Sequence, residues 1–300
     1  MRPVAGERGE AVGLIGLGNM GTALAGRLAE RTQVVGYDLD GARCAAAAAA
    51  GVRIAGTPRA VGEQATTVLL SLPRPEISRG VLGELVPIFD GGLVIETSTV
   101  SPADARAMHA EARAGGAGFV DAAILSGVGE VASGRSAFLV GGDEPDVKRA
   151  EPVLASVCER TIRFGGPGTG MAAKVINNAV AHATMVVLAE AAALAEAEGI
   201  ELDVLCRLLE EDDAGVKRPL TERLAGRVAA GDFEGGMPME AARKDSALAL
   251  DLARSRGVPL FAMQASDSVY ELALGRGLAR QDYAAVASLW WPTPAPTRSA

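Results

Sequence analysis

An amine and two amides lie within two turns of one otherwise apolar helical stretch. The run GTGMAAKVINNAVAHATMVVLAEAAALAEA begins at Gly168, and it carries Lys174, Asn177 and Asn178 near its start. Residues three and four positions apart share a helix face, so both asparagines flank Lys174 one turn on. Later positions of the same face are apolar, which is not typical of a solvated polar stripe. The pattern therefore favours a chemical site.

Lys174 is suited to proton transfer. Burial or a nearby positive charge can lower the pKa of a lysine toward neutrality, where it takes and returns the proton of a substrate hydroxyl. Hydride transfer between an alcohol and a nicotinamide cofactor needs such a group, and the neighbouring amides can hold the substrate in line. His182 lies two turns on and partly off this face. We interpret it as a packed or partner-facing residue.

A glycine loop near the start of the chain predicts the cofactor site. GLGNMG places Gly16, Gly18 and Gly21 between an apolar run and a helical pattern. In this context the glycines allow a tight turn, the approach of a pyrophosphate and close helix packing, while the helix N-terminus attracts phosphates. An ordinary strand-to-helix turn is the alternative.

Asp38 ends the second apolar run, 22 residues after Gly16. A carboxylate there can accept hydrogen bonds from the ribose hydroxyls of NAD and repels the 2′-phosphate of NADP. Arg43 is the first arginine after it. NAD is therefore the favoured cofactor, with NADP possible. The alternative role for Asp38 is to cap the helix that follows.

The pattern of apolar runs predicts the elements that position these groups. Short runs that alternate with helical segments predict a parallel sheet with helices on both faces. These runs are 11–15, 33–37, 67–72, 93–98, 118–124 and 136–142. After Gly170 all patterns are helical, at 170–198, 201–211, 217–230, 239–256 and 259–275. The expected α/β fold is a Rossmann-type dinucleotide-binding domain (11–166) followed by an all-helical domain (167–291).

Composition narrows the class of protein. The chain has 300 residues, of which 49% are hydrophobic, and a net charge of −8. Length suits two domains, and the absence of a basic patch argues against nucleic acid. Three separated cysteines and two distant histidines favour a reducing compartment and no metal site. The N-terminus is polar and lacks the pattern of a signal peptide, and no membrane span is expected. These features are typical of a cytoplasmic protein. The tail after Trp291 is expected to be disordered.

The motifs together resemble those of the β-hydroxyacid dehydrogenases, a family that includes 3-hydroxyisobutyrate and 6-phosphogluconate dehydrogenases. Four of them occur in the expected order: GLIGLGNMG (13–21), DAAILSGVGEVASG (121–134), GTGMAAKVINN (168–178) and ARKDSALALDLA (242–253). The resemblance spans about residues 11 to 290. It implies NAD-dependent hydride transfer to or from a small 3-hydroxy acid or its semialdehyde. It also implies a homodimer or higher homo-oligomer through the helical domain.

The resemblance also implies roles for individual residues. Lys174 would be the general acid/base, with Asn178 hydrogen-bonded to the substrate. Residues expected to bind the cofactor are Gly16, Leu17, Gly18, Asn19, Met20, Asp38, Leu72, Pro73, Thr99 and Lys244. Residues expected to bind the substrate are Leu125, Ser126, Gly127, Asn178 and Met237.

Two departures concern the substrate side. The family usually reads D-A-P-V-S-G-G in the substrate loop, whereas this chain has Leu125 for the serine and Ser126 for the first glycine. Gly236 and Met237 replace a proline and a phenylalanine. These changes are expected to reshape the pocket, since methionine is flexible. They leave open an imine or non-acid carbonyl reductase, and a non-catalytic dinucleotide sensor is a further alternative.

Overall fold

The computed structural model describes residues 11–291. The sequence-based expectations for the N-terminus and for the tail after Trp291 fall on residues 1–10 and 292–300, outside the described part. The chain divides between Ala179 and Val180 into two compact units. Each unit is described by itself.

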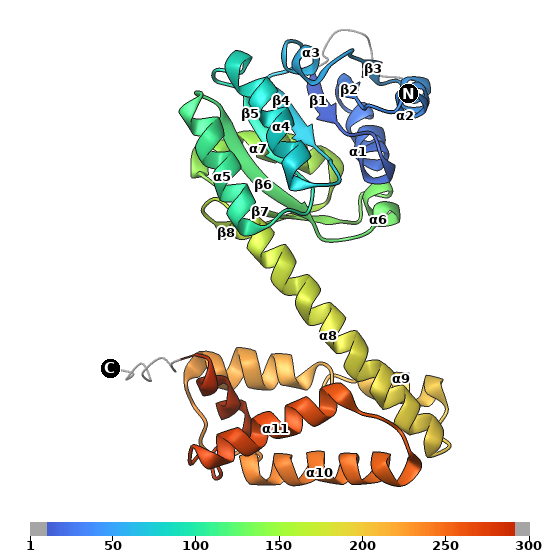
Figure 1. The fold of residues 1–300 in the computed structure, drawn as a ribbon, viewed down its shortest axis with the longest axis vertical. Coiled ribbons are helices and arrows are strands. Elements are labelled where there is room, and N and C mark those ends of the chain that lie inside the picture. Colours follow the sequence, from blue (N-terminus) through green and yellow to red (C-terminus); the bar gives the residue numbers. More distant parts are fainter. Residues whose placement is uncertain (1–10, 292–300) are drawn as a thin grey trace. The chain divides into compact units, whose positions relative to one another are not determined.

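The first unit is built on an eight-stranded sheet in the order β3-β2-β1-β4-β5-β6-β7-β8 (Figure 1). All neighbouring strands pair in parallel except β6 and β7, which are antiparallel. The strands are β1 (Val12–Ile15), β2 (Val34–Tyr37), β3 (Arg53–Ile54), β4 (Thr67–Leu70), β5 (Leu93–Glu96), β6 (Gly118–Ile124), β7 (Ala137–Gly142) and β8 (Arg160–Gly165). The predicted Rossmann-type α/β fold is confirmed.

Helices cover both faces of this sheet because the central strands are apolar on both sides. One buried cluster joins one face to α1 (Asn19–Ala29), α2 (Gly41–Ala49), α6 (Val128–Ala132) and α7 (Glu144–Val157). The other joins the opposite face to α3 (Pro58–Gly62), α4 (Pro75–Leu85) and α5 (Pro102–Ala114). The short 3₁₀ segment η1 (Val86–Ile88) follows α4. The core of the site-bearing unit is thus a three-layer sandwich.

The cap of α2 is Asp40, whose carboxylate accepts the backbone N–H groups of Ala42 and Arg43. Such a side chain satisfies N–H groups that the first turn leaves unpaired. The alternative role considered for Asp38, capping this helix, therefore belongs to Asp40, two positions later.

The second unit is helical. It contains the later part of α8 (Thr169–Ala197), then α9 (Leu202–Glu210), the π-helical η2 (Pro219–Val228), α10 (Met239–Arg256), α11 (Phe261–Gly275) and the 3₁₀ segment η3 (Tyr283–Leu289). Glu190 of α8 is buried, and its carboxylate accepts the N–H groups of Ala262 and Met263 in the first turn of α11. The predicted all-helical second half is confirmed.

Among the described residues, α8 alone is long and apolar enough to cross a membrane by length and composition. Only 11% of its most apolar 18-residue stretch is buried within the chain. Length and composition by themselves are weak evidence for a span, since helices in protein cores meet the same criterion.

Candidate active site

A cavity of about 930 Å³ opens at the carboxyl ends of the central parallel strands. It lies where the strand order reverses between β1 and β4, the position at which open α/β sheets bind ligands. Of the predicted site residues, those that line it are Gly16, Gly18, Asn19, Met20, Asp38, Leu72, Pro73, Thr99, Ser126 and Lys174. The structure thus brings the predicted cofactor loop and the predicted catalytic lysine to one cavity.

The glycine loop is fixed by close backbone packing. Gly16 has φ +97°, and a Cβ there would run into the Ser71 carbonyl at the end of β4. A Cβ on Gly21 would in turn meet the Gly16 carbonyl. Neither position has room for a side chain. Glycine at both allows the first turn of α1 to lie close to the strand ends. Leu17 is buried and does not line the cavity, but its backbone N–H donates to the Asp38 carboxylate at 2.7 Å.

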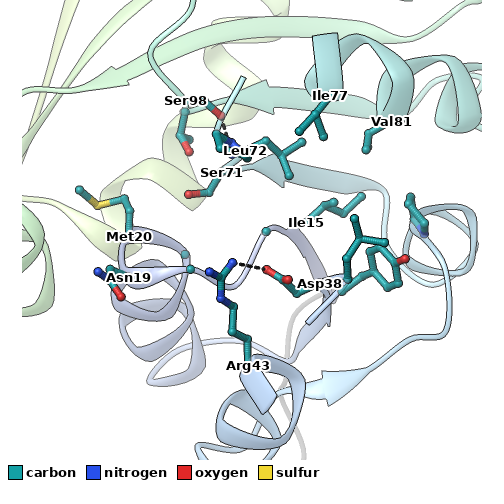
Figure 2. Close-up of a pocket in the computed structure, with 18 of the residues that line it drawn as sticks. Ile15, Asn19, Met20, Asp38, Arg43, Ser71, Leu72, Ile77, Val81 and Ser98 are labelled. Carbon is teal, nitrogen blue, oxygen red and sulfur yellow. Dashed lines mark hydrogen bonds and ion pairs between the residues drawn. The ribbon is translucent and has the colours of Figure 1, made fainter. Parts of the chain in front are cut away.

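Asp38 is held by three donors at the end of β2. Its carboxylate accepts the N–H groups of Leu17 (2.7 Å) and Asp40 (2.8 Å), and the Arg43 guanidinium lies 3.6 Å away (Figure 2). The fixed carboxylate suits a ribose diol. Arg43, to which the sequence assigned no role, is half exposed at the cavity, where a guanidinium can also receive a phosphate. This geometry accommodates NAD and leaves room for NADP.

The opposite wall comes from the ends of β4 and β5. Leu72 N–H donates to Ser98 Oγ at 2.7 Å, which ties the two strand ends together (Figure 2). Ser71, Thr97 and Ser98, which lie in segments 71–73 and 96–102 that resemble the family's cofactor contacts, also line the cavity. Tyr37, Ile77, Val81 and Ile124 line it as well, and the sequence did not single them out. Their signal was their position, since each follows or faces the carboxyl end of a parallel strand.

Lys174 reaches the cavity from the second turn of α8. Its Nζ donates to the Leu125 carbonyl oxygen at 3.4 Å, and partial burial lowers the pKa of the ammonium. The direction of this shift favours the neutral amine that a general base requires. Asn178 is half-buried and Asn177 is exposed, and neither is among the lining residues of the described first unit.

Asp121 anchors the helix that carries Lys174. This buried residue of β6 accepts the N–H of Gly168 at 2.7 Å and that of Met171 at 2.9 Å. Burial raises the pKa of Asp121, and these backbone hydrogen bonds oppose the shift. Gly170 completes the joint, because a Cβ there would lie 2.8 Å from Gly141 N and 2.9 Å from the Asp121 carbonyl oxygen. The glycines of GTGMAAK thus let α8 start directly on the sheet.

Leu125 presents its backbone rather than its side chain to the lysine. The side chain is partly buried against the core on the α3–α5 face, while the carbonyl oxygen accepts from Lys174. Its own N–H donates to Ala137 O at 2.9 Å. Of the loop that follows, Ser126 lines the cavity and Gly127 precedes α6. The change to leucine therefore adds packing beneath the site.

Met237 and Lys244 belong to the second unit. The Met237 N–H donates to the buried Asp282 carboxylate at 3.0 Å. The Lys244 side chain is 69% exposed and pairs with Asp245 at 3.3 Å. Their expected roles in binding substrate and cofactor remain predictions.

Comparison with known proteins agrees with this arrangement. The family described as "NAD binding domain of 6-phosphogluconate dehydrogenase" matches residues 11–166, and "NAD-binding of NADP-dependent 3-hydroxyisobutyrate dehydrogenase" matches residues 168–290. An NAD-dependent L-serine dehydrogenase of Pseudomonas aeruginosa is 31% identical, over 94% of this chain and 98% of its own.

Two solved structures resemble the chain to different degrees. A 3-hydroxyisobutyrate dehydrogenase of Mycobacterium tuberculosis, solved with L-serine, is 29% identical with a TM-score of 0.66, over 94% of this chain and 99% of its own. An imine reductase of Myxococcus stipitatus has a TM-score of 0.87 at 22% identity, over 94% and 100%, which shows a shared fold alone. The chain belongs to the β-hydroxyacid dehydrogenase family of NAD(P)-dependent oxidoreductases.

Proposed function

We propose that this protein transfers a hydride between NAD and a small 3-hydroxy acid, or its semialdehyde, with Lys174 as the general acid/base. The observation that carries the proposal is the placement of the Lys174 amine in the same cavity as the glycine loop and Asp38. A sensor of dinucleotides needs the loop and the aspartate but has no use for a proton-transfer group. The non-catalytic alternative is therefore disfavoured.

The residues of this cavity divide the work. A bound nicotinamide would supply the hydride acceptor for the alcohol carbon, and the hydride donor for the semialdehyde. Lys174 takes the hydroxyl proton in one direction and donates it in the other, and its lowered pKa suits both steps. The Leu125 carbonyl, 3.4 Å from Nζ, orients the amine. Asn178, one turn further along α8, holds the substrate, and the loop at Ser126 and Gly127 receives its acid group.

A substrate panel tests the reaction class. Hydroxy acids, semialdehydes and cyclic imines are each supplied with NAD(H) and NADP(H), and the change in NADH absorbance is followed. Turnover of a small 3-hydroxy acid such as L-serine or 3-hydroxyisobutyrate is expected. It should be faster with NAD, because the Asp38 carboxylate can accept ribose hydroxyls and would repel a 2′-phosphate. Turnover of cyclic imines with none on hydroxy acids would instead establish the imine reductase alternative. That alternative is suggested by the shared fold and by the altered substrate loop.

The helical unit is proposed to form a homodimer or higher homo-oligomer through α8. Val180, Met185 and Val186 are 61, 60 and 51% exposed in the single chain. A row of exposed apolar side chains on one helix is typical of a surface that a partner covers.

Met185→Glu is expected to shift the protein to a monomer, because burying a carboxylate in an apolar interface is costly. Light scattering after size-exclusion chromatography measures the mass. Gln264→Glu, which adds the same charge at an exposed polar position of α11, serves as the control and should leave the mass unchanged. An oligomer of unaltered mass in the Met185 variant would place the interface elsewhere.

A cytoplasmic location is proposed from the thiols. Cys44, Cys158 and Cys206 are all free in the described chain, which fits a compartment that keeps thiols reduced.

A further inference from the structure

Glu96 is a carboxyl group where the fold calls for an apolar residue. It ends β5, whose four residues are all buried, and its own side chain is fully buried. Burial of a charged group without full hydrogen bonding is costly. Glu96 Oε1 accepts the Ser98 N–H at 2.8 Å, whereas Oε2 has no hydrogen-bond partner of ordinary geometry within the described chain. Packing alone does not account for this residue.

A short chain of hydrogen bonds links Glu96 to the cavity. Ser98, whose N–H Glu96 holds, accepts the Leu72 N–H on its own hydroxyl at 2.7 Å (Figure 2). Ser98 and Leu72 both line the cavity, as do Thr97 and Thr99. Glu96 therefore supports the wall formed by the ends of β4 and β5.

The position of this wall along the sheet assigns it to one end of the cofactor. Asp38 follows β2 and the glycine loop follows β1, so the adenosine ribose and the pyrophosphate of a bound cofactor would lie over those strands. Lys174 contacts Leu125, directly after β6, and the hydride must pass beside that lysine. β5 lies between β4 and β6. The nicotinamide ring is therefore expected above the β5 end, over Glu96.

Few charged groups act on Glu96 from the elements around it. On β6 its register partner is Asp121, whose two oxygens are engaged by α8 backbone N–H groups. The neighbour on β4 is Leu70, and α4 presents the buried Ser78 hydroxyl. Residues of α5 in this core, such as Ala105, are apolar. Thus no cation of these elements neutralises the Glu96 carboxylate within the described chain.

We propose that Glu96 is a positioning residue that stabilises the oxidised nicotinamide, because its carboxylate places a negative charge beneath the ring that is positive in NAD⁺ and neutral in NADH. The hydrogen bond from Ser98 N–H also links the Glu96 carboxylate to the cavity wall. A charge of this kind acts on the difference between the two redox states, whereas a purely structural support would affect both alike. The proposal rests on the cofactor and not on the identity of the substrate, so binding alone tests it.

The protonation state of Glu96 gives the effect a pH dependence. Burial raises its pKa to about 7, and the hydrogen bond from Ser98 opposes the shift. A carboxyl with a raised pKa is neutral below that value and ionised above it. NAD⁺ binding favours the ionised form and should release a proton near pH 7, whereas NADH binding should not. Partial burial also lowers the pKa of Lys174 in this cavity, so the measurement is repeated in the Lys174→Ala protein.

The experiment compares NAD⁺ and NADH affinity in the wild-type and Glu96→Gln proteins. Glutamine keeps the size and the acceptor for Ser98 but not the charge. At pH 8 NAD⁺ is expected to bind about tenfold more weakly to the variant, with NADH affinity changed less than twofold. From pH 8 to pH 6 the wild-type protein should lose NAD⁺ affinity by a similar factor, and Glu96→Gln should not. NADH fluorescence and NAD⁺ competition measure both constants.

The outcomes separate charge from support. Calorimetry in buffers of different ionisation enthalpy should show NAD⁺-linked proton release in the Lys174→Ala background, and none after adding Glu96→Gln. Equal losses for NAD⁺ and NADH would overturn the proposal and leave Glu96 as a support of the wall. Unchanged affinities for both would also overturn it. If Glu96→Gln fails to fold, Glu96→Asp, which keeps the charge, must retain the NAD⁺ preference and its pH dependence.

Discussion

Lys174→Ala is expected to lower kcat by about 10²- to 10⁴-fold, the usual contribution of a positioned general acid/base. NADH affinity should change little, because the glycine loop, Asp38 and the β4–β5 wall remain intact. Lys174 is only half-buried and makes a single hydrogen bond of 3.4 Å, so the fold should tolerate the loss. Steady-state kinetics and NADH fluorescence titration measure the two effects separately.

Two controls make this test specific. Lys148→Ala removes a lysine that pairs with Glu144 on the exposed face of α7, and it should leave kcat unchanged. Small primary amines added to Lys174→Ala should restore part of the rate, because they supply the missing base. Full turnover in Lys174→Ala would remove the lysine from the mechanism and favour an imine reductase that protonates its substrate in another way.

Gly170→Ala is expected to have the second-largest effect, although Gly170 does not line the cavity. The new Cβ would press on the Leu139 carbonyl and lie 2.8 Å from Gly141 N, both backbone atoms that cannot turn aside. The first turn of α8 must then move off the sheet, and Lys174 moves with it. A cost of about 1–3 kcal/mol in the free energy of unfolding is expected from such overpacking. A shift of about 1 Å at Nζ would lower kcat by about 10²-fold.

Gly166→Ala is the matched control for this change. It lies four residues earlier in the same glycine-rich joint, and a Cβ there would have no atom within 4 Å. Its kcat and urea midpoint should equal those of the wild-type protein. If Gly170→Ala behaves in the same way, the close contact of α8 with the sheet does not position the lysine.

Most of the fold follows from patterns that the sequence displays openly. The six predicted strands are runs such as 118–124 whose apolar residues need burial on both sides, and the glycine loop marks the first crossover. Two edge strands escape this logic. β8 begins with Arg160 and is largely exposed, and β3 has two residues, so neither carries the apolar signal on which the prediction depends. The antiparallel orientation of β7 could not be predicted either, because an apolar run does not indicate the direction in which its strand pairs.

Site residues could be predicted where the side-chain type itself indicates a role. They could not be predicted where the role depends on which groups the folded chain buries together. Lys174 and Asp38 stand out because polar residues break apolar runs. Asp121 and Glu96 do so too, but only the structure shows that one holds backbone N–H groups of α8 and the other lies beneath the cavity wall. Arg43 needed the geometry of α2 to bring it within 3.6 Å of Asp38. Met237 and Lys244 stay predictions because they belong to the second unit.

The antiparallel pairing of β6 with β7 has a consequence for how substrate preference can change. Because β7 returns alongside β6, the segment between them leaves the sheet and comes back to it at one point, where Leu125 N–H donates to Ala137 O. Residues 126–135 form an excursion that includes α6 and whose two ends meet at this hydrogen bond. Substitutions at positions 126–130, none of which is buried, need not disturb the sheet or the joint that holds α8. The proposed substrate loop can therefore change, as at Ser126, without a change in the joint that carries Lys174.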